Sequence, residues 1–242
     1  MRKIFGIPIE GWGMPQAIEH IEKSAKPVWV VTANAEILLA AHRDAQYADV
    51  LRMADVRLVD GSGPWFATVC QTERIPGVDF AERLVLLAHD KKWRIGLLGG
   101  EAGEASDAAK RIRAAYPGLE VHAEQAGRIE RDGAEDATSE EARHRMTLFG
   151  PQVLLVAFGH PRQERWIAKH RAEFPELRVV VGVGGTFNFW AGRSKRAPSI
   201  MQSAGLEWLW RLIHEPRRWK RIWNAVVVFP VLFVVDRIRP IR

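Results

Sequence analysis

Asp60 is the first residue of this chain whose type and place suggest chemistry. It follows the apolar run 56–59 and precedes Gly61, Ser62 and Gly63. Glycines at such a turn let a ligand approach the backbone closely, and a carboxylate beside the ligand can act as a general base. The alternative is a turn or helix-capping aspartate, which needs the same residue type.

Four other clusters of polar residues and glycines stand directly after apolar runs. They occupy positions 32–36, 99–100, 159–164 and 184–188. If the apolar runs are parallel strands, their carboxyl ends meet at one edge of a sheet, where ligands bind in such folds. Together with Asp60, the clusters therefore predict a single ligand site.

Several of these residues have a second interpretation. Thr32 and Asn34 could hydrogen-bond to a sugar, or they could cap a helix that begins near residue 35. Gly99 and Gly100 could bind a phosphate group or form a tight turn between a strand and a helix. His160 is interpreted as a turn residue, because no serine or cysteine nucleophile pattern accompanies it. No spacing of His, Cys, Asp or Glu resembles a metal site.

The C-terminal segment carries the basic excess of the chain. Residues 190–242 hold eleven Lys and Arg against three Asp and Glu, a net charge of +8, whereas residues 1–189 have a net charge of −2. The same segment contains five of the ten tryptophans. Arg211, Arg217, Arg218 and Arg221 fall within three helical turns, and arginine is suited to bidentate contact with phosphate oxygens.

This segment ends in the apolar run 225–235, which includes Pro230 and is too short for the ~20 residues that span a bilayer. Clustered arginines, tryptophans and a short apolar run together are typical of a surface that rests on anionic lipids. A solvated helix face is one alternative, and a nucleic-acid site is disfavoured because it gives the apolar run no role. The residues predicted to contact the membrane are Trp219, Trp223, Val227, Phe229, Leu232 and Phe233.

These residues must be positioned by alternating strands and helices. The sequence predicts strands at 28–32, 56–59, 93–98, 119–124, 153–158 and 179–183. It predicts helices at 35–54, 78–90, 103–116, 162–174, 199–214 and 216–229. The pattern favours an α/β, Rossmann-like fold with a mainly parallel sheet flanked by helices. We expect an α/β catalytic domain over 1–195 and a helical, basic, membrane-associating appendage over 196–242.

Composition limits the class of protein further. With 242 residues and 47% apolar content, the chain can bury one substantial core. Its only cysteine, Cys70, is predicted on a helix, so a disulfide within the monomer is excluded and a reducing compartment is expected. The N-terminus lacks the pattern of an export signal. The apolar faces of 35–54 and of the tail suit either a homo-oligomer interface or the bilayer.

Several of these motifs together resemble the WecG/TagA/CpsF family of glycosyltransferases, glycosyltransferase family 26. The matching segments are TANAEI (32–37), VDGSG (59–63), RIPGVDF (74–80), GHPRQERW (159–166), GVGGTFNFWAG (182–192) and RAPSIMQSAGLEWLWRLIHEPRRWKR (196–221). They follow the family's order and cover nearly the whole chain.

The resemblance implies an inverting transferase that needs no metal or other cofactor. Such an enzyme moves a hexose or N-acetylhexosamine-type sugar from a UDP-sugar to a polyprenyl-diphosphate-linked saccharide. It would act in surface or exopolysaccharide synthesis, as a peripheral protein at the cytoplasmic face of the plasma membrane. The predicted catalytic residues are Asp60 as the base, Thr32 and Asn34 as contacts to the sugar or acceptor, and Arg74 and Gln163 lining the same pocket. The predicted nucleotide- or diphosphate-binding residues are Gly99, Gly100, Gly184, Gly185, Thr186, Asn188, Arg211, Arg218 and Arg221.

Two positions depart from the family's pattern. The family often has aspartate where this chain has Asn188, and an aromatic residue is expected where Arg128 follows Gly127. N-acetylmannosamine, its uronic acid and glucose all stay open as the donor sugar.

Two other classes of protein are weighed against the transferase. A non-catalytic scaffold that binds nucleotide sugars and lipid would use the same surfaces without transfer. A Rossmann-type oxidoreductase is disfavoured, because no G-x-G-x-x-G follows an early strand with an acidic residue about 20 positions later.

Overall fold

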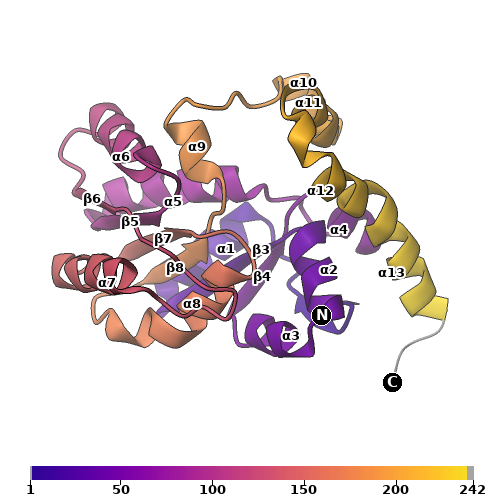
Figure 1. Ribbon diagram of the computed structural model, residues 1–242, viewed down its shortest axis with the longest axis horizontal. Coiled ribbons are helices and arrows are strands. Elements are labelled where there is room, and N and C mark those ends of the chain that lie inside the picture. The colour runs from indigo at the N-terminus through magenta and orange to yellow at the C-terminus, as the bar shows by residue number, and fades with distance from the viewer. Residues whose placement is uncertain (1, 239–242) are drawn as a thin grey trace.

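A six-stranded parallel sheet forms the centre of the computed structural model, which describes residues 2–238 apart from the side chains of Ser199, Ser203, Arg211 and Arg218. The strand order is β4-β3-β8-β7-β5-β6 (Figure 1). The strands are β3 (Val28–Ala33), β4 (Val56–Val59), β5 (Ile95–Gly99), β6 (Val121–Glu124), β7 (Val153–Ala157) and β8 (Val179–Gly182). All six predicted strands are confirmed, with bounds that differ by at most two residues at either end.

Helices cover both faces of the sheet, because successive residues of its strands point to opposite sides. In β3, Trp29 and Val31 belong to one buried cluster, whereas Val28 and Val30 belong to the other. The first cluster lies under α2 (Ala35–Arg43), α3 (Ala45–Arg52), α7 (Ala137–Phe149) and α8 (Arg162–His170). The second lies under α1 (Met14–Lys23), α5 (Gly77–Lys91) and α6 (Glu104–Ala115).

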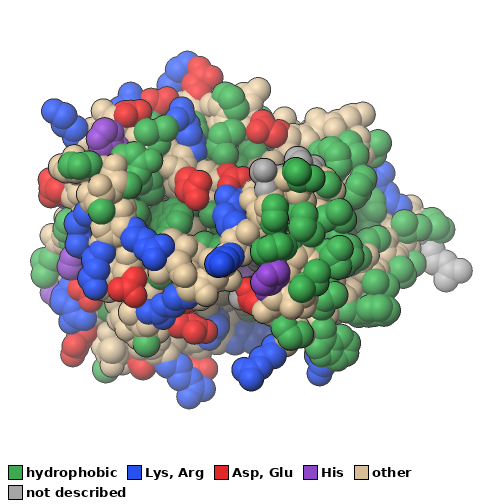
Figure 2. Space-filling view, turned by 90° about the horizontal axis from the view of Figure 1, so that it is seen from above, with side chains coloured by type: hydrophobic (Ala, Val, Ile, Leu, Met, Phe, Trp, Pro, Cys, Tyr) green, Lys and Arg blue, Asp and Glu red, His purple; other side chains and the backbone are tan. Residues whose placement is uncertain are grey.

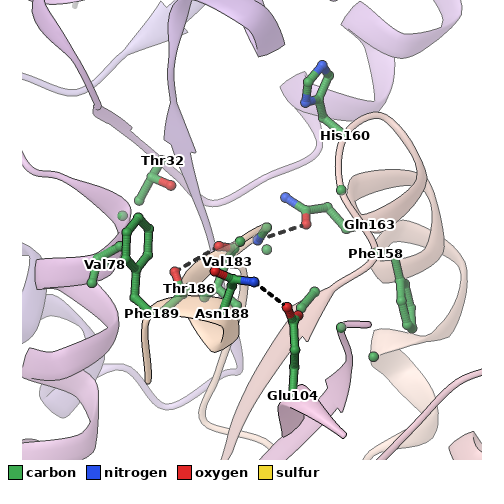
Figure 3. Close-up of a pocket in the computed structure, with 18 of the residues that line it drawn as sticks. Thr32, Val78, Glu104, Phe158, His160, Gln163, Val183, Thr186, Asn188 and Phe189 are labelled. Carbon is green, nitrogen blue, oxygen red and sulfur yellow. Dashed lines mark hydrogen bonds between the residues drawn. The ribbon is translucent and has the colours of Figure 1, made fainter. Parts of the chain in front are cut away.

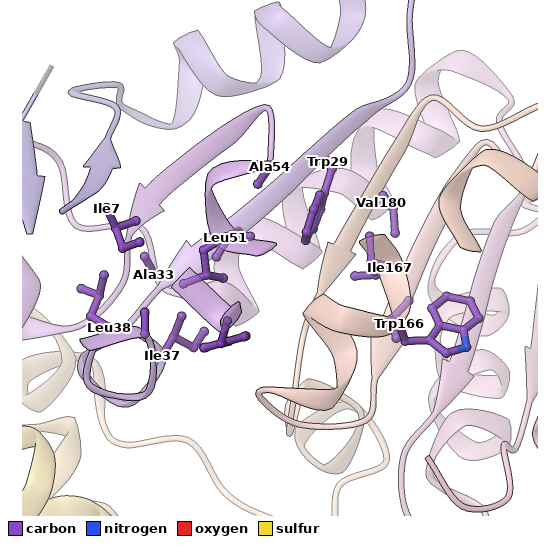
Figure 4. Close-up of a cluster of buried hydrophobic side chains, with 14 of the residues drawn as sticks. Ile7, Trp29, Ala33, Ile37, Leu38, Leu51, Ala54, Trp166, Ile167 and Val180 are labelled. Carbon is purple, nitrogen blue, oxygen red and sulfur yellow. The ribbon is translucent and has the colours of Figure 1, made fainter. Parts of the chain in front are cut away.

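Figure 4 shows part of the first cluster, where Trp29 of β3 lies near Leu51 of α3 and Ile167 of α8. Strands buried between two helical layers explain why nearly continuous apolar runs in the sequence identified the sheet. The Rossmann-like α/β prediction is confirmed.

Several short elements, among them α1, were not predicted from the sequence. A hairpin of β1 (Arg2–Ile4) and β2 (Ile7–Ile9) precedes α1. The short helices α4 (Ser62–Ala67) and α9 (Thr186–Trp190) follow β4 and β8. All of these are shorter than the windows in which hydrophobic periodicity is readable.

Local capping breaks two of the predicted helices. The segment 35–54 divides at Asp44, whose side chain accepts a hydrogen bond from the Tyr47 amide at 3.0 Å and so starts α3. The segment 199–214 divides at Gly205, where φ is +73°, into α10 (Ser199–Ser203) and α11 (Glu207–His214). Cys70 was wrongly placed on a helix: it is exposed in the turn after α4 with φ of +54°.

The tail runs from Pro216 as one helical path longer than the predicted 216–229. A 3₁₀ turn (Pro216–Arg218) leads into α12 (Trp219–Trp223), a π-helical stretch (Asn224–Val228) and α13 (Phe229–Ile238). This path lies along α2 and α4 (Figure 1). None of the helices within residues 2–238 is both long and apolar enough to cross a bilayer.

Phe229 was wrongly assigned to the membrane, because it is buried in the first core cluster with 1% of its surface exposed. Its ring packs edge-on against Phe5 with 5.6 Å between centroids, and a Cβ atom at Gly63 would lie 3.1 Å from the ring. Leu232 and Phe233 are half-buried against the same cluster. The helical run 225–235 carries apolar side chains on every side, so one of its sides packs against the protein.

The replacement Phe229→Ala is expected to weaken docking of the tail by about 3 kcal/mol, because it leaves a cavity beside Phe5 and Gly63. Hydrogen exchange of the α13 amides measures the loss. Val234→Ala serves as the matched control, since Val234 is 53% exposed and its truncation leaves no cavity. Equal protection of α13 in the two variants would contradict the docking described above.

Candidate active site

A cavity of about 420 Å³ lies at the carboxyl edge of the sheet. All five predicted clusters contribute to its wall, from the ends of β3, β4, β5, β7 and β8. Figure 3 shows Thr32, Gln163 and Asn188 in this wall. The predicted site residues that line it are Thr32, Asn34, Asp60, Gly99, Gly100, Gln163, Gly184, Gly185, Thr186, Asn188 and Arg221. Residues far apart in the sequence therefore meet where parallel pairing predicts.

Asp60 and Thr32 face the same point of the cavity, where α5 begins. A Cβ atom placed on Gly77 would lie 3.0 Å from Thr32 Oγ1 and 3.6 Å from Asp60 Oδ2. The N-cap of α4 is Gly61, so Asp60 does not occupy the capping position considered as its alternative. Asn34 does cap: its Oδ1 accepts a hydrogen bond from the Ile37 amide at 3.0 Å while the residue also lines the cavity.

Gln163 is held by a buried network beneath the cavity. Its Nε2 donates to Glu164 Oε1 at 2.7 Å, and its Oε1 accepts from the Gly184 amide at 3.2 Å. The Tyr47 hydroxyl donates to Glu164 Oε2 at 2.9 Å. The network thus joins α3, α8 and the glycine turn after β8, and it fixes the direction of the Gln163 amide.

Burial in this network raises the pKa of the Glu164 carboxyl above its ordinary value of 4.5, although hydrogen bonds from Gln163 and Tyr47 favour the charged form. Burial, reinforced by Glu164, also raises the pKa of the Tyr47 hydroxyl well above 10. Tyr47 therefore stays a hydrogen-bond donor at neutral pH.

Asn188 lies in the cavity wall beside Glu104. Sequence reasoning missed Glu104. The Asn188 Nδ2 donates to Glu104 Oε1 at 2.6 Å, and Glu104 Oε2 accepts from the Glu101 amide at 3.0 Å (Figure 3). An aspartate at 188 would place two carboxylates in contact, whereas the Asn188 amide donates a hydrogen bond to Glu104. Arg128, the other departure, is exposed and pairs with Glu130 at 2.8 Å instead of lining the cavity.

The tail meets the cavity through Arg221. Its Nε and Nη2 donate to the Glu36 carboxylate at 2.9 and 2.6 Å, and this contact raises the pKa of Arg221. His160 Nδ1 lies 3.8 Å from the same carboxylate. A second cavity, of about 660 Å³, begins at Glu36, His160 and Arg221 and continues along α2 and the start of α3.

Among the predicted residues whose side chains are described, Arg74 does not line the cavity. Arg74 donates to the Gln202 carbonyl and so ties the start of α5 to α10; its part in the site stays a prediction. The side chains of Arg211 and Arg218 lie outside the described residues. Thr186 uses its hydroxyl locally, donating to the Val183 carbonyl at 2.8 Å. Within residues 2–238, no three His, Cys, Asp or Glu side chains gather as metal ligands would.

Comparison with known proteins yields a family and several relatives. The profile of the Glycosyl transferase WecG/TagA/CpsF family matches residues 2–242. A protein of Staphylococcus aureus named N-acetylglucosaminyldiphosphoundecaprenol N-acetyl-beta-D-mannosaminyltransferase is 33% identical, over 90% of this chain and 85% of the relative. A protein of the same name from Bacillus spizizenii is 32% identical, over 85% of this chain and 80% of the relative.

Replacing Glu164 tests the buried network through the pH dependence of stability. A carboxyl whose pKa is raised by folding stabilises the native state fully below its unfolded pKa and loses that contribution as pH rises through the raised value. The free energy of unfolding should therefore fall less steeply above pH 4.5 in Glu164→Gln than in the unaltered protein.

Denaturant unfolding across this pH range measures the difference. Glu176→Gln, which removes an exposed carboxylate, serves as the control and should follow the original profile. Parallel profiles for Glu164→Gln and the unaltered protein would show that Glu164 is not held as described.

Proposed function

The chain belongs to the WecG/TagA/CpsF family of glycosyl transferases, and on that premise we propose that it transfers a sugar, with inversion, from a UDP-sugar to a saccharide linked to polyprenyl diphosphate. The observation that carries the proposal is the position of Asp60 and Thr32 in the cavity at the carboxyl edge of the sheet. The acceptor class is taken from the names of the relatives, which specify an N-acetylglucosaminyl-diphosphoundecaprenol acceptor.

In the proposed reaction Asp60 is the general base. The acceptor hydroxyl gives its proton to the Asp60 carboxylate as its oxygen bonds to the anomeric carbon of the donor. The bond from that carbon to the diphosphate breaks on the opposite side, and UDP leaves with the electron pair. A positioned base contributes about 10²–10⁴-fold to such a step. Thr32, beside Asp60, would orient the same hydroxyl.

Departing UDP needs compensation for its growing negative charge. We assign this role to arginines of the tail, without a metal ion, because donors fixed in advance stabilise charge most effectively in a site that excludes water. Arg221 is at the cavity mouth and is paired with Glu36 in this structure. Phosphate oxygens would compete with that carboxylate for the guanidinium group.

The two cavities suit the two substrates. They meet at His160 and Arg221, which line both, and the larger one leads away from Asp60 along α2. A lipid-linked acceptor needs a passage between the reacting sugar and the membrane, and a donor alone would leave this second space unused. We propose that the acceptor enters by this route.

A band of exposed apolar side chains marks the surface that would meet the membrane. It consists of Phe66 and Val69 near α4, Trp219 and Trp223 of α12, and Val231, Val234 and Val235 of α13. Figure 2 shows apolar side chains gathered over this end of the molecule. With the basic excess of the tail, this exposed band fits a peripheral contact with anionic lipids at the cytoplasmic face of the membrane.

A transfer assay tests the enzyme directly. UDP-N-acetylmannosamine is the first donor to try, with N-acetylglucosamine linked through diphosphate to a short prenyl chain as acceptor and mass spectrometry as readout. Asp60→Asn should lower turnover by about 10²–10⁴-fold while UDP binding is kept. Asp90→Asn, at an exposed position of α5, is the control. Binding of UDP without transfer to any lipid-linked acceptor, across all donors, would favour a scaffold instead.

Vesicle binding tests the exposed band. Val231→Glu with Val234→Glu should weaken binding to vesicles containing anionic phosphatidylglycerol by about tenfold or more, because the substitutions remove apolar contact and add negative charge. Leu148→Glu carries the same change to an exposed residue of α7 and should bind as the unaltered protein does. Sedimentation with vesicles gives the bound fraction, and equal losses in both variants would count against this surface.

A further inference from the structure

The Glu104 carboxylate is a buried charge in the cavity wall that the proposed reaction does not use. Glu104 is only 4% exposed, yet it lines the cavity beside the Gly99–Gly100 turn. It accepts hydrogen bonds from two neutral donors, the Glu101 amide and Asn188 Nδ2. It forms no ion pair with any residue in the described part of the chain.

The Glu104 carboxylate can accept more hydrogen bonds than the protein provides. Two oxygens offer about four lone-pair sites, and the protein fills one on each oxygen. Burying a charge is unfavourable unless hydrogen bonds compensate it. The open side of Glu104 is the cavity, so a ligand that brings hydroxyl donors would complete the set.

The negative charge of Glu104 also disfavours the binding of a phosphate group at the Gly99–Gly100 turn. The backbone at Gly100 passes so close that a Cβ atom there would lie 3.1 Å from Glu104 Oε2. A diphosphate bound on the Gly99–Gly100 turn would therefore meet a carboxylate in surroundings of low dielectric constant, where like charges repel strongly. This differs from the phosphate-binding turn expected from the sequence.

We propose that Glu104 and Asn188 form the ribose subsite of the donor and bind its vicinal 2′- and 3′-hydroxyl groups. The inference rests on the proposed use of a UDP-sugar. Each hydroxyl donates to a Glu104 oxygen, and the Asn188 amide holds the carboxylate in place from the other side (Figure 3). A nucleotide that lacks one of these hydroxyl groups leaves a lone pair of the buried Glu104 carboxylate without a hydrogen bond.

The strand order supports this placement. From one side of the sheet to the other the strands run β6, β5, β7, β8, β3, β4. With ribose at Glu104 after β5, the base lies toward Ala126 and Gly127 after β6, which line the same cavity. The diphosphate then lies toward Gly184 after β8, and the transferred sugar reaches Asp60 after β4. The donor thus lies across the sheet edge in one direction.

Calorimetric binding of UDP, 2′-deoxy-UDP and 3′-deoxy-UDP tests the subsite without any turnover. The unaltered protein should bind UDP at least about tenfold more tightly than either deoxy analogue, since each lost hydrogen bond is to a charged group. In Glu104→Gln, UDP should bind at least about tenfold more weakly, and the preference for UDP over the analogues should largely disappear. If Glu104 only supported the fold, its replacement would weaken the binding of all three ligands by the same factor.

Glu120→Gln is the matched control, because it removes an exposed carboxylate at the opposite edge of the sheet, just before β6. Glu120→Gln should keep both the affinity for UDP and the preference for UDP over the deoxy analogues. Equal binding of the three ligands by the unaltered protein overturns the proposal even if Glu104→Gln does not fold, as does a preference that survives in Glu104→Gln. Failure of the unaltered protein to bind UDP at all would instead overturn the proposed donor.

Discussion

Parallel pairing of six buried strands is the constraint on which the rest of this structure depends. Because every strand runs in the same direction, each one ends at the same edge, and the segments that follow must turn back over that edge as loops and helix starts. Asp60, Thr32, Gln163 and Asn188 are separated by as many as 156 positions in the sequence, and this geometry alone brings them to one cavity. The helices on both faces keep the sheet dry, so polar groups gather at the edge, where they can be used.

The cavity is held in shape by buried hydrogen bonds between side chains and backbone. Gln163 is fixed between Glu164 and the Gly184 amide, and Glu104 is fixed between Asn188 and the Glu101 amide. Each of these carboxylates is unfavourable to bury by itself, and its hydrogen bonds recover part of that free energy while setting a direction. The first network holds the glycine turn after β8, and the second holds the chain just after the Gly99–Gly100 turn.

The tail combines two roles that its composition suggested separately. Phe229 anchors it in the core beside Phe5, whereas Val231 and Val234 of the same helix face outward. Upstream on the same helical path, Arg221 reaches the cavity mouth and pairs with Glu36. An exposed apolar surface and a cation at the cavity mouth are therefore carried by one helical path, as the proposed transfer to a lipid-linked acceptor would require.

The sequence by itself determined the class of fold, the six strands and a set of site residues most of which line one cavity, because continuous apolar runs and the glycines after them are local signals. It did not determine where a cap would interrupt a helix, as at Asp44 and Gly205. One capping residue can end a helix although the apolar periodicity continues past it. Glu104 looked like an ordinary acid in the first turn of a helix. Only tertiary structure decided that Glu104 lies beside Asn188 in the cavity wall and that Phe229 points into the core, because burial of one side chain depends on what distant segments place beside it.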